Sequence, residues 1–501
     1  MKSLRIKGFR SILDTGKVEL KPITAIIGKN SCGKSSFIRF FPLLKQSTEK
    51  EISETLLWFG EYVDFGDYKS IKPKFNVKTP TSFEIEFDIS DIDRYSSFDF
   101  DLENKLEKVY LTLTMEIAEK HIPFLSLAYF DQKIEIFMNE NGSVDKIFIN
   151  GRDAFTANSK YFWSKDSRLL IPALTNTTIN NDEYIFFFKD RIMERELKSI
   201  ISNILPKNTD REKIQMLCHL LTELRSQEAL FNFLCTYKDL PKISTFFKTQ
   251  TMESEYFIAV NTYSILSKLP YYIQIINRIL INETENIHYL KPIRASVNRY
   301  YRIQGLSINH VDADGSNLAM ILHNLSTSER MAFEKWTQEN FDIKFSVAKS
   351  AGHTSLIVFD RNGNAINLAD TGYGYSQILP VIVELWLLLK KKSDDKTITI
   401  VIEQPELHLH PAFQAKVIDL FANIVQQAQN NNIDLKIIFE THSETMINRL
   451  GYLINKKIIN ANDVNILAFD KGDMQTTITP KQFDEEGFVL EWPVGFFSAE
   501  E

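Results

Sequence analysis

The chain has 501 residues, of which 58 are Lys or Arg and 65 are Asp or Glu, and its formal net charge is −7. At roughly 150 residues per domain this length predicts about three units, and the 44% hydrophobic and 25% charged shares exclude a disordered, collagenous or coiled-coil chain. No apolar run reaches the roughly 20 residues of a membrane span, and three scattered cysteines indicate no disulfide framework, so we expect a cytoplasmic protein with no membrane partner.

The N-terminal part begins with strand patterns. Residues 3–9 alternate apolar and polar side chains, as a half-buried strand does. Residues 23–27 form a continuous apolar, β-branched run that is typical of a buried parallel strand. Gly28 ends this run, and a helix is predicted from Lys34, with Pro42 disturbing it. Short strand patterns over 81–150, with a hairpin signal at Asn141-Gly142, predict an antiparallel region.

The middle and C-terminal parts have different periods. From about residue 190 to 283, apolar residues recur at three- and four-residue spacings, which predicts a helical segment. From about residue 286, helical patterns alternate with buried strand patterns at 397–402 and 435–439. Strands that alternate with helices predict a mostly parallel sheet with flanking helices. The fold class is therefore α/β, with an added antiparallel β region and a helical insertion.

A phosphate-binding loop is the most specific motif. The pattern G-x-x-x-x-G-K-[ST] is matched in full, between a predicted buried strand and a predicted helix, by Gly28, Lys29, Asn30, Ser31, Cys32, Gly33, Lys34 and Ser35. The glycines let backbone N–H groups point inward, and the helix N-terminus adds positive potential. We expect Lys34 to reach the β- and γ-phosphates of a nucleotide and Ser35 to ligate Mg²⁺. A chance glycine-rich turn would lack this strand and helix context.

Two further strand ends carry polar side chains. Glu403, Gln404 and Glu406 follow the buried strand at 397–402, and His442 follows the strand at 435–439. Ligand chemistry in a parallel sheet lies at the carboxyl ends of its strands. An acid there can hold Mg²⁺, a further acid can orient an attacking water, and a histidine can contact a γ-phosphate. The alternatives are a solvent-exposed strand end and a histidine that merely precedes the helix cap Ser443.

Together these elements resemble the ABC-type ATPases of the SMC/RecF/OLD group, whose N-terminal strand motif is similar to residues 4–11. The resemblance makes 28–35 Walker A, 398–403 Walker B and His442 the switch histidine. The glycine-containing turn at 371–377 occupies the place of the signature motif, which in that group caps ATP held by the opposite subunit, so a homodimer through the ATP sites is implied. The implied nucleotide contacts are Arg10, residues 28–35, Ser36, Gly372, Tyr373 and Gly374, with Ser35 and Glu403 as metal ligands.

A narrower resemblance concerns residues 289–294, 310–317, 402–411 and the tail 491–497. These segments are similar to a prokaryotic subgroup of AAA ATPases that includes the ATPases of the anti-phage systems Septu (PtuA) and PARIS (AriA). It implies a separate effector protein, an HNH or Toprim-like nuclease, under control of the ATPase, and leaves a larger homo-oligomer open. The implied division is an N-terminal ATPase lobe over 1–150, a mainly helical insertion over 151–285 and a C-terminal ATPase lobe over 286–501.

Two departures from the group's pattern bear on catalysis. Gln404 holds the position of the usual catalytic glutamate, and an amide can orient water without taking its proton. Glu406 can substitute, or hydrolysis is slow. Gly372 replaces the usual serine of the signature turn. The alternatives that remain are a DNA-repair ATPase of the SMC/RecF kind that acts on DNA itself, a transporter subunit and an ATP-binding scaffold with little turnover.

An arginine- and tyrosine-rich segment bears on the question of nucleic acid. Arg294, Arg299 and Arg302 interleave with Tyr300 and Tyr301. Such a pattern is compatible with contacts to nucleic acid, to a nucleotide or only to acidic side chains. The net negative charge disfavours general nucleic-acid binding, although a local basic groove remains open.

Overall fold

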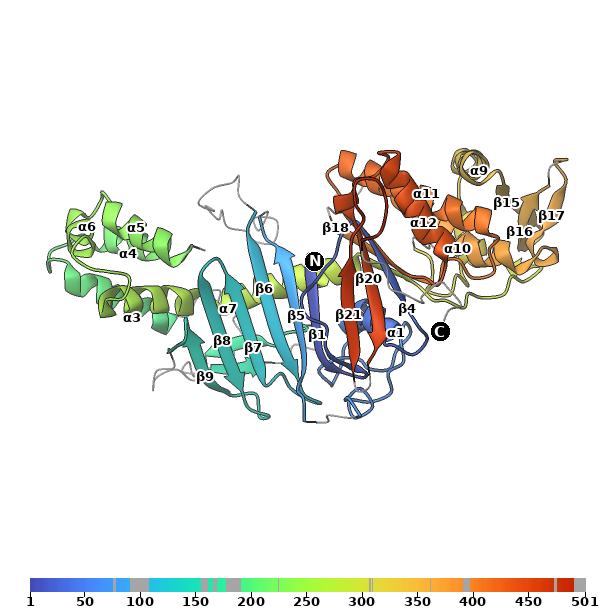
Figure 1. Cartoon of the computed structure of the whole chain (residues 1–501). Coiled ribbons are helices and arrows are strands. Elements are labelled where there is room, and N and C mark those ends of the chain that lie inside the picture. Colours follow the sequence, from blue (N-terminus) through green and yellow to red (C-terminus); the bar gives the residue numbers. More distant parts are fainter. Residues whose placement is uncertain are drawn as a thin grey trace.

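The computed structural model describes residues 1–490 apart from 75–77, 91–107, 155–160, 165–168, 177–190, 224, 306–307, 309, 361, 391–396 and 473–474. The tail motif at 491–497 therefore lies outside the described residues. The described part is elongated (Figure 1), with a group of helices at one end, an antiparallel sheet beside it, a parallel sheet near the middle and a small third sheet at the other end.

A six-stranded, mostly parallel sheet lies at the centre of the molecule. Its strands, in spatial order, are β13 (Ile287–Leu290), β18 (Thr397–Glu403), β19 (Asp434–Glu440), β4 (Ile23–Gly28), β20 (Val464–Lys471) and β21 (Thr476–Lys481). Only β21 is antiparallel to its neighbour. All six residues of β4 are buried, which confirms the prediction of a buried parallel strand over 23–27.

This sheet joins segments that are far apart in the sequence. Strand β4 comes from the N-terminal part and lies between β19 and β20 from the C-terminal part. The carboxyl ends of the parallel strands meet at one edge, so Gly28, Glu403 and Glu440 end three neighbouring strands there. Within the register, Glu403 is the partner of Glu440.

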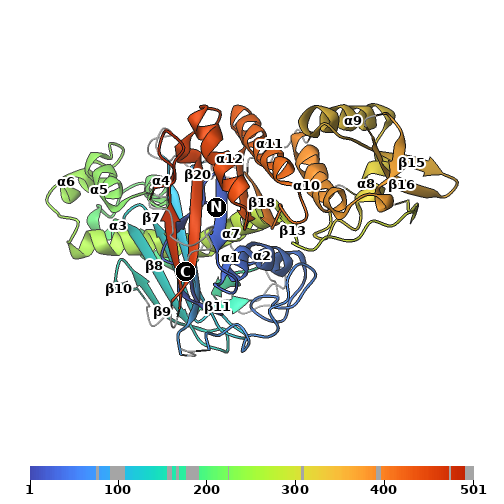
Figure 2. The same cartoon turned by 45° about the vertical axis from the view of Figure 1, so that its right-hand side comes forward.

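Side chains on the two faces of the sheet enter two different cores. Alternate residues, such as Ile26 and Val401, pack into the core that also holds the antiparallel sheet. Their neighbours, such as Ile27 and Ile400, pack into the core of the C-terminal helices. These helices (Figure 2) are α10 (Tyr373–Lys390), α11 (Pro411–Asn430) and α12 (Glu444–Asn455).

The helix that follows the phosphate loop is broken. It forms α1 (Lys34–Ile38) and α2 (Phe40–Glu49), and the break falls at Arg39 rather than at Pro42. Pro42 lies in the first turn of α2, where its missing N–H has no intrahelical partner to lose. The prediction of a helix from Lys34 is confirmed, and the predicted disturbance is displaced by three residues.

The antiparallel region is a nine-stranded sheet. The hairpin between the strands at 132–138 and 144–149 turns at Asn141-Gly142, as predicted. The strands are β1 (Ser3–Phe9), β2 (Ile12–Asp14), β3 (Val18–Glu19), β5 (Thr81–Asp88), β6 (Tyr110–Ile117), β7 (Phe124–Tyr129), β8 (Gln132–Met138), β9 (Val144–Ile149) and β10 (Arg152–Asp153). A separate two-stranded hairpin consists of β11 (Tyr161–Ser164) and β12 (Ala173–Asn176).

A group of helices with its own small core follows the antiparallel sheet. These helices are α3 (Arg191–Ile204), α4 (Arg211–Leu220), α5 (Gln227–Thr236), α6 (Pro241–Phe247) and α7 (Glu255–Glu285). At about 1.5 Å per residue the 31-residue α7 is about 47 Å long. It runs from this group along the antiparallel sheet to the parallel sheet (Figure 1), and so ties the helical segment to the rest of the chain.

The third sheet lies at the opposite end of the molecule. It contains β14 (Tyr301–Arg302), β15 (Lys344–Ser350), β16 (His353–Phe359) and β17 (Ala365–Asn367). The remaining elements are the helices α8 (Leu318–Asn324) and α9 (Thr327–Phe341) and two 3-10 turns, η2 (Leu368–Asp370) and η3 (Ala461–Asp463).

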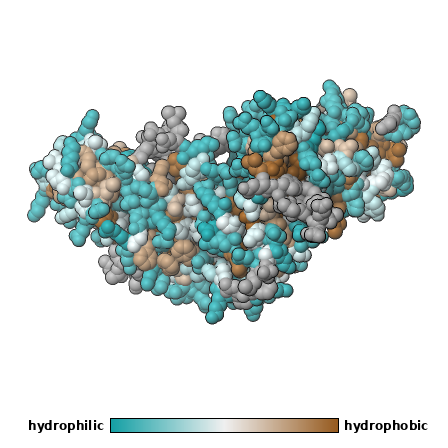
Figure 3. Space-filling model, viewed as in Figure 1, coloured by the Kyte–Doolittle hydropathy of each residue, from teal (hydrophilic) through white to brown (hydrophobic). Residues whose placement is uncertain are grey.

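The surface and the helices of the chain bear on whether it crosses a membrane. Hydrophilic residues cover most of the face seen in Figure 3, and apolar residues form separate patches on it. Among the described helices, none combines the length and the apolar character that crossing a bilayer requires.

The α/β class, with its parallel sheet and added antiparallel region, is confirmed.

A close backbone contact holds the C-terminal segment on α12 and gives a test of the fold. A Cβ added to Gly487 would lie 2.0 Å from the carbonyl oxygen of Gly451, and Gly487 has a φ of +82°. Gly352 has a similar φ of +74° but open space around it. We expect Gly352→Ala to cost about 1 kcal/mol of backbone strain, and Gly487→Ala to cost about 1–3 kcal/mol more through overpacking. Urea denaturation followed by circular dichroism measures both, and equal losses would contradict the contact.

Candidate functional site

The phosphate loop adopts a backbone that requires glycine at two positions. A Cβ on Gly28 would lie 2.4 Å from the carbonyl oxygen of Phe469 on the neighbouring strand β20. Gly33 has a φ of +97°, and a Cβ there would lie 2.8 Å from the Ser11 hydroxyl oxygen. Ser31 also adopts a left-handed conformation, with a φ of 62°. The loop is therefore packed closely between β20 and the segment that follows β1.

Lys34 is held inside this loop. Its side chain is buried, with the residue only 3% exposed. The Nζ atom donates hydrogen bonds of 2.8 Å to the carbonyl oxygens of Gly28 and Lys29, and lies 3.6 Å from Oε1 of Glu440. The ammonium group thus lies where a phosphate in the loop would meet it.

Glu440 contacts Lys34 and Ser35 of the loop, although sequence reasoning gave it no role. It ends β19, is 3% exposed, and accepts a hydrogen bond of 3.3 Å from the Ser35 hydroxyl. Burial raises the pKa of its carboxyl group, and the Lys34 ammonium acts in the opposite direction. The signal that could have identified it was an acid at the end of a buried strand, next to the residues already singled out there.

Glu403, the predicted metal ligand, has other partners in this structure. Its Oε1 accepts hydrogen bonds of 2.7 Å from Nε of Arg39 and 2.6 Å from the Tyr289 hydroxyl, and its Oε2 accepts one of 2.9 Å from Nη2 of Arg39. The hydrogen bond to Glu403 raises the pKa of Arg39, and burial raises the pKa of Tyr289. Sequence reasoning missed both partners, because Arg39 belongs to no motif and the resemblance at 289–294 gave Tyr289 no role in the site.

The other predicted catalytic residues separate into two groups. Gln404 and His442 line the cavity beside the loop, whereas Glu406 is not among its lining residues. Gln404 has a φ of 45° and donates its backbone N–H to the carbonyl oxygen of Glu440 at 2.9 Å. Glu406 accepts a hydrogen bond of 2.7 Å from the backbone N–H of His442, and burial raises the pKa of its carboxyl group. Glu406 therefore holds the backbone of His442 in place through this hydrogen bond.

His442 lies near two charged side chains, the Glu440 carboxylate on β19 and the Lys34 ammonium of the loop. Its Nε2 lies 3.9 Å from Oε1 of Glu440. Burial lowers the pKa of the imidazole, and the nearby Lys34 ammonium lowers it further. Both causes favour the neutral ring, which can donate or accept one hydrogen bond at each nitrogen according to its tautomer.

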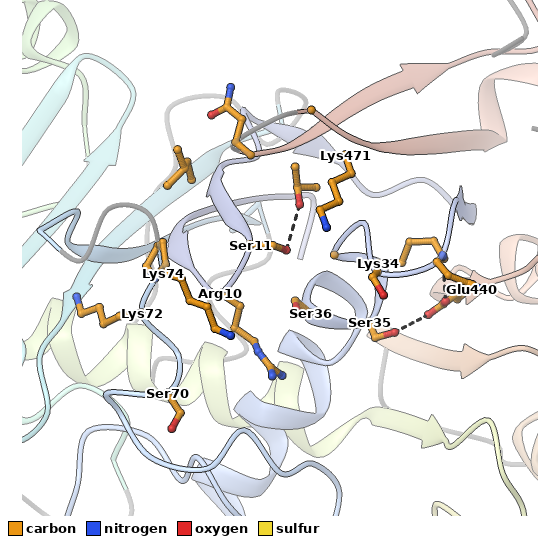
Figure 4. Close-up of a pocket in the computed structure, with 18 of the residues that line it drawn as sticks. Arg10, Ser11, Lys34, Ser35, Ser36, Ser70, Lys72, Lys74, Glu440 and Lys471 are labelled. Atoms are coloured by element: carbon orange, nitrogen blue, oxygen red, sulfur yellow. Dashed lines mark hydrogen bonds and ion pairs between the residues drawn. The ribbon is translucent and has the colours of Figure 1, made fainter. Parts of the chain in front are cut away.

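A cavity of about 740 Å³ lies in front of the loop (Figure 4). Of the predicted nucleotide contacts, those that line it are Arg10, Asn30, Ser31, Gly33, Lys34, Ser35 and Ser36; Gly28, Lys29 and Cys32 are not among the lining residues. Further lining residues, to which sequence reasoning gave no role in the site, are Ser11, Ser70, Lys72, Lys74, Lys471 and Thr476. Among the described lining residues, five carry a Lys or Arg charge and Glu440 alone carries a carboxylate, so the cavity suits a polyanionic ligand.

The predicted signature turn lies at the start of α10, away from this cavity. Gly372, Tyr373 and Gly374 are not among its lining residues. Tyr373 is 71% exposed, and a Cβ on Gly374 would lie 2.8 Å from the carbonyl oxygen of His408. One chain therefore does not bring this turn to its own phosphate loop.

Arg294 is buried, whereas a residue that binds nucleic acid needs an exposed side chain. It is 3% exposed, and its Nη2 donates a hydrogen bond of 3.2 Å to the carbonyl oxygen of Glu403. Burial lowers its pKa to about 10, and the carboxylates of Glu406 and Glu403 act in the opposite direction. The hydrogen bond from Nη2 of Arg294 thus goes to the backbone of the acidic strand end, and its burial leaves no exposed guanidinium for nucleic acid. Arg299 forms an exposed ion pair with Asp370.

The donor atoms beside the loop suit a magnesium ion. No group of three or more His, Cys, Asp or Glu side chains that could hold a metal occurs within the described residues. Mg²⁺ needs no such cage, because it keeps several waters and uses one or two carboxylates together with phosphate oxygens. The Ser35 hydroxyl and the Glu440 carboxylate are oxygen donors of this kind.

The chain was compared with known proteins. A search of the curated proteins finds no match. Solved structures that match nearly the whole chain include an SMC head domain from Pyrococcus furiosus, bound to the C-terminal domain of ScpA. The match has 12% sequence identity and a TM-score of 0.37, and it covers 96% of this chain and 95% of that chain. An SMC head domain from Thermotoga maritima matches with 10% identity, coverage of 96% and 98%, and a TM-score of 0.35.

The family comparison is the decisive one. The model of a family described as "AAA ATPase domain" matches residues 1–447. This match covers most of the chain and includes the phosphate loop, the acidic strand ends and His442. The protein therefore belongs to the AAA ATPase domain family.

Proposed function

We propose that this chain binds ATP with Mg²⁺ in the cavity beside the phosphate loop, hydrolyses it slowly, and thereby controls a separate effector protein. The observation that carries the proposal is the cavity itself, which is lined by phosphate-loop residues together with the basic side chains of Arg10, Lys72, Lys74 and Lys471. The loop N–H groups and Lys34 would bind the phosphates, while Arg10, Lys74 and Lys471 point into the same space (Figure 4). Bound Mg²⁺ would neutralise part of the phosphate charge.

Slow hydrolysis is proposed because of the side chain at position 404. Gln404 lines the cavity beside Glu440 and His442. An amide can hold an attacking water through a hydrogen bond, but it cannot accept the proton that the water loses. Glu406 is directed to the backbone of His442 instead of the cavity, so it supplies no replacement base in this conformation.

A homodimer is proposed because one chain does not complete the site. Gly372 and Tyr373 are exposed, and no residue of the turn at 372–374 lines the cavity of its own chain. The turn resembles a motif that caps the ATP of an opposite subunit. In a homodimer of two chains arranged head to tail, the turn of each chain would contact the nucleotide bound by the other chain. ATP would then favour the dimer, because it would contact both subunits.

The effector and its biological role rest on motif resemblance. The segments at 289–294 and 402–411 are similar to those of the Septu and PARIS ATPases, which implies anti-phage defence with an HNH or Toprim-like nuclease as the partner. The buried position of Arg294 removes one residue from the surface that direct DNA binding would use. We therefore favour control of a partner over the alternative, an SMC/RecF-like ATPase that acts on DNA itself.

Removing the loop lysine tests nucleotide binding. Lys34→Ala should weaken ATP binding by about 10- to 100-fold, because it deletes charge-assisted hydrogen bonds worth about 1.5–3 kcal/mol. Lys213→Ala, an exposed lysine on α4, is the matched control and should bind ATP as the wild type does. Isothermal titration calorimetry measures both affinities. Unchanged binding by Lys34→Ala would argue against this cavity as the nucleotide site.

Restoring a carboxylate at position 404 tests the cause of slow turnover. Gln404→Glu should hydrolyse ATP faster, by at least about tenfold, because general-base catalysis contributes roughly 10²- to 10⁴-fold where the geometry is suitable. Gln404→Ala, which supplies neither a base nor an amide, should show no such gain. Phosphate release under saturating ATP measures the rate. A rate for Gln404→Glu equal to or below that of the wild type would refute this role of Gln404.

The purified chain tests the assignment of nuclease activity to a partner. We expect ATP binding without cleavage of DNA, because no nuclease motif is recognisable in the sequence. Gel assays with plasmid and linear DNA, in the presence of Mg²⁺ and ATP, provide the measurement. Efficient cleavage by the single chain would contradict the proposal, and ATP hydrolysis that DNA strongly stimulates would favour the DNA-repair alternative.

A further inference from the structure

We propose that Glu440, at the end of β19, is the acidic ligand of the Mg²⁺ that accompanies ATP, and that Glu403 instead holds the phosphate-loop helix in place. This inference rests on the proposed function, since it concerns the metal of the same nucleotide site. It moves the metal-binding acid from the strand end named by the sequence motif to the end of the neighbouring strand.

The first argument is that the oxygens of Glu403 are already engaged. Three donors, two from Arg39 and the hydroxyl of Tyr289, share its two carboxylate oxygens at 2.6–2.9 Å. A bidentate arginine pair is among the strongest side-chain interactions in proteins. Glu403 is also absent from the residues that line the cavity. Three of the roughly four acceptor positions on its two oxygens are therefore used by donors that do not line the cavity.

The second argument is the position of Glu440 beside the loop. Its Oε2 lies 3.3 Å from the Ser35 hydroxyl oxygen, and the residue lines the cavity. Adjacent ligands of an octahedral Mg²⁺, with bonds of about 2.0–2.1 Å, lie about 3.0 Å apart. The two oxygens therefore already have nearly the separation that neighbouring ligands of one magnesium ion require. Figure 4 shows both side chains on the same side of the cavity.

The third argument concerns charge. Lys34 lies 3.6 Å from Glu440 and donates two hydrogen bonds to carbonyl oxygens of its own loop. Once Lys34 turns to the phosphates of ATP, the Glu440 carboxylate faces those phosphates with less compensation. Without a divalent cation it repels them, and with one it attracts the cation that they share. Glu440 should thus weaken metal-free ATP binding and strengthen binding in the presence of Mg²⁺.

These opposite effects of Glu440 on ATP binding, without and with Mg²⁺, can be tested on the full-length chain. The affinity for a fluorescent ATP analogue is measured in excess EDTA and in excess Mg²⁺, for the wild type, Glu440→Gln and the matched variant Glu403→Gln. The wild type should bind about tenfold or more tightly with Mg²⁺. Glu440→Gln should bind as tightly as the wild type or up to about tenfold more tightly in EDTA, and should gain less than about twofold from Mg²⁺. Glu403→Gln leaves Arg39 without its charged partner and should bind ATP more weakly under both conditions, while the ratio of its affinities in Mg²⁺ and EDTA should stay that of the wild type.

A second readout follows the metal directly. Mn²⁺ replaces Mg²⁺ in the presence of ATP, and electron paramagnetic resonance measures the free Mn²⁺. The free Mn²⁺ concentration that half-saturates the site should be about tenfold higher for Glu440→Gln than for the wild type, and unchanged for Glu403→Gln. Glu440→Asp keeps the charge beside Lys34 while withdrawing the carboxylate from Ser35. It should fold and bind metal-free ATP as the wild type does, yet lose most of the Mg²⁺ gain, even where Glu440→Gln is unstable.

The outcomes separate this inference from the function on which it rests. A wild type that binds no ATP would overturn both. A wild type with the Mg²⁺ gain, together with Glu440 variants that keep it, would overturn the metal assignment alone. Loss of the gain in Glu403→Gln but not in the Glu440 variants would return the metal to Glu403.

Discussion

Two carboxylates buried side by side constrain the whole arrangement of the site. Glu403 and Glu440 are register partners on β18 and β19, and they are 2% and 3% exposed. Removing the partner of a buried charge costs about 3–5 kcal/mol, so each carboxylate needs a cation close by. Both cations come from one short segment: Lys34 begins α1 and pairs with Glu440, and Arg39 follows α1 and pairs with Glu403. The two ion pairs therefore fix α1 across the ends of both strands.

The same constraint explains why distant segments meet. The phosphate loop can reach Glu440 only if β4 lies next to β19, and this places an N-terminal strand inside a C-terminal sheet. The antiparallel sheet shares a core with α1, α2 and α7, and so sets the position of the segment between α2 and β5. Ile71 is fully buried there and accepts a hydrogen bond from the backbone of Arg10, which brings Ser70, Lys72 and Lys74 to the cavity.

The sequence predicted the parts of this site that are local in the chain. The phosphate loop is one continuous motif, so its residue types, its strand and its helix could all be inferred together. The roles of the acids could not be inferred in this way, because they depend on which strands are neighbours. Arg39 lies 364 residues from Glu403, and no spacing rule connects them. Lys72 and Lys74 belong to no motif at all, and the core that positions them is a property of the folded chain.

The link between the signature turn and the acidic strand passes through Arg294. Gln377, in the first turns of α10, exchanges hydrogen bonds of 3.3 and 3.4 Å with the backbone of Arg294, whose Nη2 donates to the carbonyl oxygen of Glu403. A subunit that pressed on the exposed turn at 372–374 would thus act on the backbone beside Gln404.

The side chains of this link are polar, and some of their buried atoms lack hydrogen-bond partners. Within the described residues, Nε and Nη1 of Arg294 and Oε2 of Glu406 are buried without a hydrogen-bond partner. Each such atom costs about 1–3 kcal/mol, and more where the group is charged. The orphaned atoms belong to groups of opposite charge, and each carboxylate near the arginine favours its charged form. A displacement that brought Arg294 into contact with Glu406 would remove part of this cost, so the resting arrangement opposes such a motion less than a fully paired network would.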